Sequence, residues 1–426
     1  MTPDGTSRAP GGTARPALAR CAGVEPAVFA GSYWGKAPLL TRAADSEGRG
    51  AGFTDLLGLD DVDELLSRRG LRTPFLRVAK DGQVVPAARF TGGGGAGAEV
   101  SDQVLDERVL ALYAGGATLV LQGLHRLWPP LVDFATELAG QVGQPAQVNA
   151  YLTPAGGRGF ATHYDTHDVF VLQVDGRKRW RVHEPVLPDP LERQAWGGRA
   201  AEVAATAVGD PALDVVLGPG DALYLPRGWL HAADALAEPS LHLTVGIRAL
   251  TRYAVVEALL DLATADPRLR ATLPFGLDVA DPDQLGPALA DTVEALRDWL
   301  SRADPAAVAG RLRERAWRAG RPAPIRPVAQ AAAIEILTAD TRLAVRPGLR
   351  WRLVPDGADR VALHTFDRTV SFPGWCALPV RVLLDGGVER VGDLPGMDPD
   401  DQLVLARRLL REAIVVPLDR SREQHQ

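Results

Sequence analysis

The feature that most constrains the fold is a change in hydrophobic period near residue 149. From residue 149 to residue 248, short apolar runs alternate with Gly, Pro and Asp. Runs of this length, bounded by turn residues, are typical of β-strands. The Asp175-Gly176 dipeptide lies between two such runs and predicts a β-hairpin. We therefore expect an all-β domain with several short strands, either a barrel or a jelly roll.

Residues 185–208 interrupt this pattern. They contain three prolines, Trp196 and two glycines, so they do not read as a strand. We expect an insertion that lies over one rim of the β domain. A second rim candidate is the glycine-rich stretch at residues 91–98, TGGGGAGA, which predicts a flexible loop.

Helical periodicity occurs on both sides of the β region. Before it, two helical patterns between residues 102 and 143 flank a short strand at residues 117–121. After it, one helix carries an apolar stripe that we expect to lie partly in a two-fold interface: Leu285, Leu289, Val293, Leu296 and Leu300. The proline-rich residues 321–328 predict a linker, followed by a small domain with short strands and a last helix at residues 400–413.

Charge and cysteine content exclude several classes of function. Lys+Arg 47 against Asp+Glu 53 leaves a net charge of −6 with no dense basic cluster, so we expect no direct nucleic-acid binding. Cys21 and Cys376 lie far apart and predict neither a disulfide framework nor a structural zinc site. No apolar run is long enough to span a bilayer. We expect a soluble, cytoplasmic protein.

A metal site is predicted from His163, Asp165 and His231. In a strand, His163 and Asp165 would project from the same side and could bind one ion together. A His two places before an Asp is a weak signal alone, so a third ligand is needed. The best candidate is His231, 66 positions after Asp165, at the end of another apolar run. Two imidazoles and one carboxylate form the facial triad of non-haem Fe(II) oxygenases.

An anion site is predicted from Lys178. Residues 177–182 alternate, with arginines on one face and Lys178, Trp180 and Val182 on the other. The arginine face must be solvated, so Lys178 points inward, although only three of the 47 basic residues are lysines. A buried ammonium is unfavourable unless an anion meets it. The distal carboxylate of 2-oxoglutarate would suit this position; a structural ion pair with an acidic side chain is the alternative.

Other polar side chains are weaker candidates. Asn149 and Tyr151 share one strand face and could donate hydrogen bonds to the same carboxylate, or they could be a satisfied polar pair in a barrel wall. His242 and Thr244 share a face that could point either way, and a hydrogen-bonded core histidine is the favoured interpretation of His242. His167 could compete as a metal ligand, but it ranks below His231.

Together these motifs resemble those of the JmjC-type ribosomal oxygenases, a branch of the cupin-like Fe(II)- and 2-oxoglutarate-dependent oxygenases. The matching stretches are NAY, HYDTHDVFVLQVDGRKRW, GDALYLPRGWLH and SLHLTVGI, with SYWGKAPLL near the N-terminus. The resemblance runs from about residue 28 to about residue 419. It implies an α+β fold with a double-stranded β-helix core. The implied divisions are a disordered tail at 1–17, a JmjC or cupin-like catalytic domain at 18–250, a helical dimerisation region at 251–320 and a winged-helix-like domain at 321–426.

The resemblance also assigns roles to individual residues. It places His163, Asp165 and His231 on the catalytic metal triad and Lys178 on the residue that pairs with the distal carboxylate of 2-oxoglutarate. Asn149 and Tyr151 fall on auxiliary cosubstrate contacts. One position departs from the pattern. Some relatives have a hydroxyl-bearing residue where this chain has Gly246, so that contact is either lost or taken over by Thr244.

The implied activity is hydroxylation of an Arg or His side chain of a protein, with a ribosomal protein as the expected substrate. In this reaction 2-oxoglutarate is converted to succinate. The implied assembly is a homodimer. Two alternatives stay open: the same chemistry on a small molecule or on a peptide natural-product precursor, and a metal-binding cupin without oxygen chemistry. The two rim segments, at residues 91–98 and 185–208, favour a protein substrate because flexible loops commonly carry recognition on a rigid scaffold.

Overall fold

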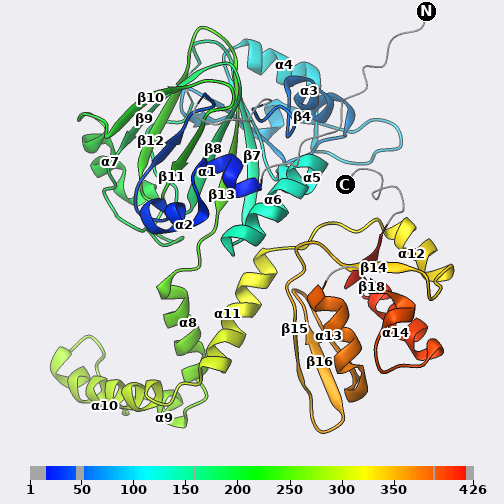
Figure 1. Ribbon diagram of the computed structural model, residues 1–426. Helices are drawn as coiled ribbons and strands as arrows, with labels where there is room; N and C mark the ends of the chain where they lie inside the picture. The colour runs from blue at the N-terminus through cyan, green and yellow to red at the C-terminus, as the bar shows by residue number, and fades with distance from the viewer. Residues whose placement is uncertain (1–15, 45–51, 158, 387–388, 419–426) are drawn as a thin grey trace, which may run out of the picture. The chain divides into compact units, whose positions relative to one another are not determined.

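The computed structural model describes residues 16–44, 52–157, 159–386 and 389–418 (Figure 1). Most of the predicted tail at residues 1–17 lies outside these ranges. Its last residue does not belong to a tail, because Ala17 begins helix α1 (Ala17–Ala22) and donates its N–H to Glu137 at 3.0 Å. No described helix has the length and apolar character that a membrane crossing requires.

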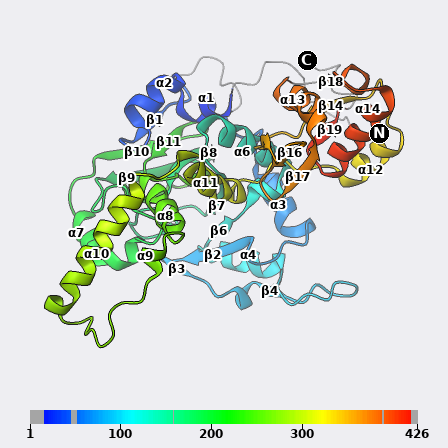
Figure 2. The ribbon, with the colours of Figure 1, turned by 90° about the horizontal axis from the view of Figure 1, so that it is seen from below.

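Two antiparallel sheets form the β core. The larger sheet has the strand order β1-β11-β8-β13-β7-β6-β2-β3, and the smaller has the order β10-β9-β12. In Figure 2 the strands β7, β6, β2 and β3 follow one another toward one edge of the larger sheet. The predicted barrel or jelly roll is confirmed. The strands are β1 (Leu39–Thr41), β2 (Leu76–Lys80), β3 (Gln83–Val84), β6 (Thr118–Leu121), β7 (Ala146–Thr153), β8 (Asp168–Asp175), β9 (Lys178–His183), β10 (Leu213–Leu217), β11 (Ala222–Leu225), β12 (Leu230–Ala235) and β13 (Ser240–Ile247).

The turn at Asp175-Gly176 does not close a hairpin, so that prediction is wrong. Strand β8 pairs with β11 and β13, whereas β9 pairs with β10 and β12. The turn therefore carries the chain from one sheet to the other. Gly176 has φ +61°, and a Cβ there would lie 1.9 Å from the carbonyl oxygen of Pro239, so only glycine fits this crossing.

Helices cover the outer face of the larger sheet. They include α3 (Leu59–Arg68), α4 (Asp106–Ala114), α5 (Leu124–Leu127) and α6 (Pro129–Val142). The apolar stripe of α6, with Leu131, Phe134 and Leu138, packs in one cluster with Leu243 and Val245 of β13. Because side chains alternate along a strand, this packing turns His242 and Thr244 toward the interior of the β core.

The two rim segments are more regular than their composition predicts. Thr91–Gly92 is a short strand, β4, that pairs with β5 (Gln103–Val104), so the glycine-rich stretch belongs to a small hairpin. The insertion at residues 185–208 contains a 3-10 turn, Trp196–Arg199, and the helix α7 (Ala200–Thr206). Both segments are poor in large apolar side chains, and backbone hydrogen bonds account for much of their regular structure.

The chain divides into two compact units. One contains Met1–Ala249, Pro322–Leu349 and Pro373–Gln426; the other contains Leu250–Arg321 and Arg350–Phe372. The second unit holds α8 (Arg252–Ala263), α9 (Pro267–Arg270), α10 (Pro282–Leu300), α11 (Pro305–Ala319) and the three-stranded sheet β15 (Arg352–Pro355), β16 (Arg360–His364) and β17 (Thr369–Pro373). The predicted division put that sheet in the C-terminal domain instead. The prediction could not assign this sheet to the second unit, because the sequence of the three strands does not show which distant residues they contact.

The remaining C-terminal elements belong to the first unit. They are α12 (Pro327–Glu335), β14 (Arg342–Val345), α13 (Ala377–Gly386), β18 (Glu389–Arg390), α14 (Pro399–Arg411) and β19 (Val415–Pro417). Strand β14 lies between β18 and β19 in a small sheet. The predicted last helix corresponds to α14, where the Asp398 side chain accepts the N–H of Asp401 at 2.9 Å and caps the helix start.

Candidate active site

Two segments far apart in the sequence meet at His163 and His231. His163 lies before β8 rather than within a strand, so the predicted strand geometry of His163 and Asp165 is wrong in detail. His163 instead forms an isolated bridge to His231 at the start of β12. The N–H of His163 donates to the carbonyl of His231 at 3.2 Å, and the N–H of His231 donates to the carbonyl of His163 at 2.8 Å. This reciprocal pair brings the predicted ligands together.

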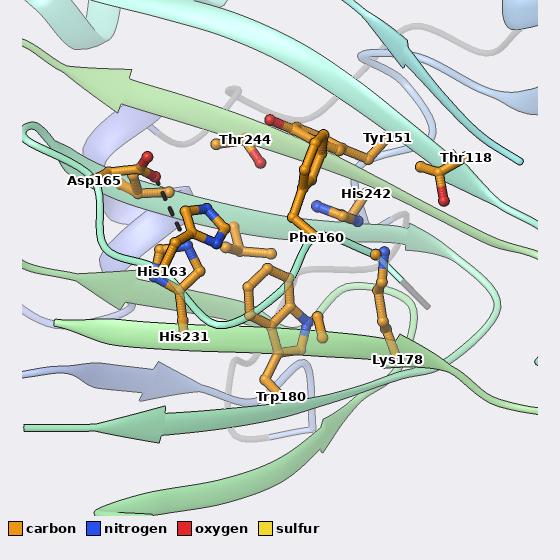
Figure 3. Close-up of a pocket in the computed structure, with 14 residues that line it drawn as sticks. Thr118, Tyr151, Phe160, His163, Asp165, Lys178, Trp180, His231, His242 and Thr244 are labelled. Atoms are coloured by element: carbon orange, nitrogen blue, oxygen red, sulfur yellow. Dashed lines mark ion pairs between the residues drawn. The ribbon is translucent and has the colours of Figure 1, made fainter. Parts of the chain in front are cut away.

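The side chains of His163, Asp165 and His231 converge on one position (Figure 3). Their candidate ligand atoms all lie within 4.8 Å of one another, and His231 Nε2 lies 3.8 Å from Asp165 Oδ2. Across the described ranges, this is the one group of three or more His, Cys, Asp or Glu side chains with such spacing. The structure thus assembles the three residues that the sequence singled out.

Backbone carbonyls orient both imidazoles. Nδ1 of His163 lies 2.8 Å from the carbonyl of Ala161, and Nδ1 of His231 lies 3.1 Å from the carbonyl of Trp229. A carbonyl only accepts, so each Nδ1 carries the proton and each Nε2 presents a lone pair. Outer hydrogen bonds of this kind fix the tautomer of metal-binding histidines.

The charge states also suit a divalent metal. Burial, and then the nearby His163, lower the pKa of His231 to about 4, so its ring is neutral near pH 7. Burial opposes ionisation of Asp165, but the imidazoles of His231, His167 and His163 outweigh it and lower the pKa of this carboxyl. Two imidazole nitrogens and one carboxylate oxygen on one side of an ion fit Fe(II), with positions left for other ligands.

Lys178 is buried without a carboxylate partner in the part of the chain that the structure describes. Its side chain is 2% exposed, and Nζ donates to Thr153 Oγ1 at 2.9 Å. Thr118 Oγ1 donates in turn to Thr153 Oγ1 at 3.3 Å. Burial lowers the pKa of Lys178 to about 7, against a small opposing effect of Asp234. The structural ion pair is therefore not found, and the ammonium needs an anion from outside the chain.

One cavity joins the metal triad to Lys178. Its volume is about 70 Å³, which is room for several waters or a small organic anion. Figure 3 shows Trp180 between His231 and Lys178. Trp180 Nε1 and His242 Nδ1 are buried and have no hydrogen-bond partner in the described protein. The lining residues are Thr118, Tyr151, Gly159, Phe160, His163, Asp165, Val169, Val171, Lys178, Trp180, His231, Ala233, His242 and Thr244.

The auxiliary residues differ in their positions. Tyr151 lines the cavity and stacks on His242, with ring centroids 4.9 Å apart and an interplanar angle of 7°. Thr244 also lines it. Asn149 does not, and its Oδ1 accepts the N–H of Gly123 at 3.0 Å. His242 lines the cavity, and its Nδ1 has no hydrogen-bond partner in the described protein, so the expectation of a hydrogen-bonded core histidine is wrong for this atom.

Gly246 is explained by His167. A Cβ at Gly246 would lie 2.5 Å from Cδ2 and 2.6 Å from Nε2 of His167, so the imidazole occupies the space of a side chain. His167 is outside the metal-binding group. The hydroxyl contact is therefore absent at position 246, and the neighbouring hydroxyl in the cavity is that of Thr244.

Aromatic side chains that the sequence analysis did not assign to the site surround His163. The ring of Phe160 lies 6.1 Å from it, and that of Trp196, from the rim insertion, lies 6.3 Å from it. Arg77 covers Phe160 at 5.1 Å. Thr118 and Thr153 were missed as well. Of these residues, only Trp196 was recognisable in the sequence, as an unusual residue of the insertion. The positions of the other residues depend on which strands become neighbours.

Comparison with known proteins finds similarity in the part of the chain that carries this site. Residues 132–255 match the model described as JmjC domain. Ribosomal oxygenase 1 of Rattus norvegicus is 33% identical over 232 residues, covering 54% of this chain and 36% of the relative. The bifunctional lysine-specific demethylase and histidyl-hydroxylase NO66 of Drosophila persimilis is 30% identical over 298 residues, covering 66% of this chain and 40% of the relative. The chain thus spans less than half the length of these relatives.

A solved structure has the same fold along most of the chain. It is YcfD, a ribosomal oxygenase from Escherichia coli in complex with cobalt and 2-oxoglutarate. The TM-score is 0.51 at 18% identity, with 93% of this chain and 99% of that chain covered. Residues 132–255 are therefore similar to a JmjC domain, and the chain shares the fold of YcfD along most of its length.

Proposed function

We propose that the protein is an Fe(II)- and 2-oxoglutarate-dependent oxygenase that hydroxylates a side chain of another protein. The observation that carries this proposal is a single cavity with a His-Asp-His triad at one end and the unpaired ammonium of Lys178 at the other. A 2-oxo acid can chelate a metal, and its distal carboxylate can meet an ammonium. The relatives named as ribosomal oxygenase and histidyl-hydroxylase, and the relative bound to cobalt and 2-oxoglutarate, support this assignment.

Each residue has a defined part in this activity. His163 and His231 supply neutral nitrogens, and Asp165 supplies one negative charge to the cation. Lys178 binds the distal carboxylate, while Trp180, Val169 and Val171 keep that end of the cavity dry. Iron with 2-oxoglutarate and O₂ supplies the oxidising power: one oxygen atom enters a C–H bond, and 2-oxoglutarate becomes succinate and CO₂.

We propose an Arg or His side chain of a ribosomal protein as the target. Phe160 and Trp196 both lie near His163, and aromatic rings are favourable surfaces for a flat side chain. Trp196 is 37% exposed and belongs to the insertion at residues 185–208, which is long enough to support an extended backbone. Both features favour a residue presented by a polypeptide over a free amino acid.

Intact-mass measurement tests the substrate. The protein would be incubated with Fe(II), 2-oxoglutarate and peptides that span Arg and His residues of ribosomal proteins. We expect a gain of one oxygen atom on a peptide and none on free arginine or histidine. His231→Ala serves as the control for uncatalysed oxidation. Equal efficiency on a free amino acid would overturn the protein substrate and favour a small-molecule one.

We also propose the finer architecture and setting of the protein. Residues 251–320 serve as a dimerisation region, a proposal supported by exposed apolar side chains on α10. Residues 321–426 form a winged-helix-like domain that binds no nucleic acid, supported by the acidic stretch before α14. A cytoplasmic location is supported by Cys21 and Cys376, which are both buried and are not joined in a disulfide. Fluorescence anisotropy with labelled DNA and RNA tests whether the protein binds nucleic acid, and we expect no binding.

A further inference from the structure

Asp168 is a buried carboxylate outside the metal triad. It begins β8, is fully buried, and accepts the backbone N–H of Arg227 at 2.9 Å through Oδ1. Its Oδ2 has no hydrogen-bond partner among the described residues and lies 4.0 Å from Nη1 of Arg227. Burial raises the pKa of Asp168, and the N–H and guanidinium of Arg227 oppose that rise. Burying a carboxylate without full hydrogen bonding lowers the stability of the protein, so a functional role would explain why Asp168 is present.

The segment that Asp168 holds is the turn between β11 and β12. This turn leads directly to His231, and the N–H of Gly228 in the turn donates to the carbonyl of Asp165 at 3.0 Å. Two hydrogen bonds therefore tie the turn to the segment that carries Asp165: one from Arg227 to Asp168 and one from Gly228 to Asp165. Two ligands of the triad are held in register by these bonds.

The same turn contacts the rim insertion. Nη2 of Arg227 forms an ion pair with Asp189 at 2.9 Å, and the Arg227 side chain is only 14% exposed. Gly228 has φ +89°, and a Cβ there would lie 2.7 Å from the carbonyl oxygen of Leu187 and 2.9 Å from Pro190. The turn thus lies directly against residues 187–190 of the insertion that also brings Trp196 to His163.

We propose that Asp168 and Arg227 form a clamp that positions the metal ligands and joins them to the substrate rim. The backbone N–H of Arg227 bonds Asp168, and its guanidinium pairs with Asp189 and lies 4.0 Å from Asp168. The spacing of Asp165 and His231 and the position of the insertion therefore depend on one residue. Both are positioning residues, since neither lines the cavity. This inference rests on the metal site of the proposed function but not on its oxygen chemistry.

Metal affinity separates positioning from simple structural support. Co(II) would be titrated into the metal-free protein by calorimetry, and the visible spectrum of the Co(II) complex would be recorded. Outer partners of metal ligands typically affect affinity by 10- to 100-fold, so we expect Arg227→Gln and Asp168→Asn to bind Co(II) about tenfold or more weakly, with an altered spectrum. The variant that combines Arg227→Gln with Asp168→Asn should bind Co(II) more tightly than the product of the two single losses predicts, because it removes both charges together.

Arg179→Gln is the matched control. It breaks the Arg179–Asp214 pair on the solvated face of the same β core, where Arg179 Nε donates to Asp214 at 2.7 Å, and it should leave Co(II) affinity unchanged. Arg227→Lys keeps the positive charge beside Asp168 but lacks the planar fork that pairs with Asp189, so its Co(II) affinity should fall between those of the parent and Arg227→Gln. This comparison holds even if Asp168→Asn fails to fold.

The rim provides the second measurement. Asp189→Asn should raise the KM for a peptide substrate while leaving Co(II) affinity within twofold of the parent. A Co(II) affinity and spectrum that are unchanged in both Arg227 variants would overturn the clamp while leaving the proposed function intact. A parent protein that does not bind Co(II) would instead overturn the metal site, and the clamp with it.

Discussion

Replacing Lys178 by Met is expected to weaken cosubstrate binding and stabilise the protein at the same time. Methionine has a similar length and no charge, so it fills the space beside Trp180 without a buried ammonium. Among the described residues, the hydrogen-bond partner of that ammonium is the hydroxyl of Thr153. The two effects have opposite signs because the charge is unfavourable until an anion arrives.

The loss of affinity can be bounded from the contact that disappears. A hydrogen bond to a charged group contributes about 1.5–3 kcal/mol, and each 1.4 kcal/mol is about tenfold in affinity. Lys178→Met should therefore bind 2-oxoglutarate about 10- to 100-fold more weakly. Affinity for Co(II) should change little, because Lys178 is not a metal ligand. The affinity of Lys178→Arg for 2-oxoglutarate should lie between those of the parent and Lys178→Met, since the planar guanidinium keeps the charge but not the shape of the ammonium.

The gain in stability follows from the pKa of Lys178. Burial lowers this pKa from 10.5 to about 7, and each pKa unit is worth about 1.4 kcal/mol, so burial of the charged form costs on the order of 5 kcal/mol. The penalty is complete below about pH 7 and disappears as the pH rises toward 10.5. Between these values the unfolded chain binds more protons, so the stability of the parent rises with pH.

Calorimetry and urea unfolding test both halves. Binding of 2-oxoglutarate to the Co(II) protein would be measured for the parent, Lys178→Met and Lys178→Arg. The free energy of unfolding of the metal-free proteins would be measured at pH 7 and pH 9.5. We expect the advantage of Lys178→Met at pH 7 to shrink by pH 9.5. Parent-like binding of 2-oxoglutarate by Lys178→Met would refute the anion site, and a less stable Lys178→Met at pH 7 would refute the unpaired charge.

Three further predictions follow from the same coordinates. His231→Ala should bind Co(II) more weakly than any clamp variant while its circular dichroism spectrum stays like that of the parent, because it removes a ligand rather than an outer partner; parent-like Co(II) affinity would contradict the triad. Gly246→Ala should lower the free energy of unfolding by about 1–3 kcal/mol in urea titrations, because its methyl group meets the ring of His167, and adding His167→Ala should restore most of the loss. Leu289 and Val293 of α10 are 56% and 46% exposed, so replacing both by Glu should reduce a dimer mass to a monomer mass in light scattering; a parent that is already a monomer at micromolar concentration would count against the interface.

Local periodicity was enough to predict which side chains share a face. Alternation along residues 177–182 predicts an inward Lys178 beside Trp180, and the structure buries both. The stripe on α6 likewise predicts its buried face at Leu131, Phe134 and Leu138. These predictions depend only on the repeat of one strand or one helix, which the neighbouring residues determine.

Strand partners were not predictable in the same way. Asp175-Gly176 has the composition of a hairpin turn, yet it joins strands of different sheets, because turn chemistry sets the local backbone and not the pairing of the strands that follow. Thr118 and Thr153 could not be connected with Lys178 for a related reason. They lie on the paired region of β6 and β7, and their approach to Lys178 depends on how two sheets pack.

The sequence by itself determined the donor set of this protein: two imidazoles, one carboxylate and one inward ammonium. The tertiary structure decided which face of β13 turns toward the cavity, that His163 pairs with His231, and that Lys178 meets no acidic side chain among the described residues. Each of these outcomes depends on contacts between residues far apart in the chain. Such contacts form only when apolar surfaces from several strands and helices are buried together, and no local pattern records them.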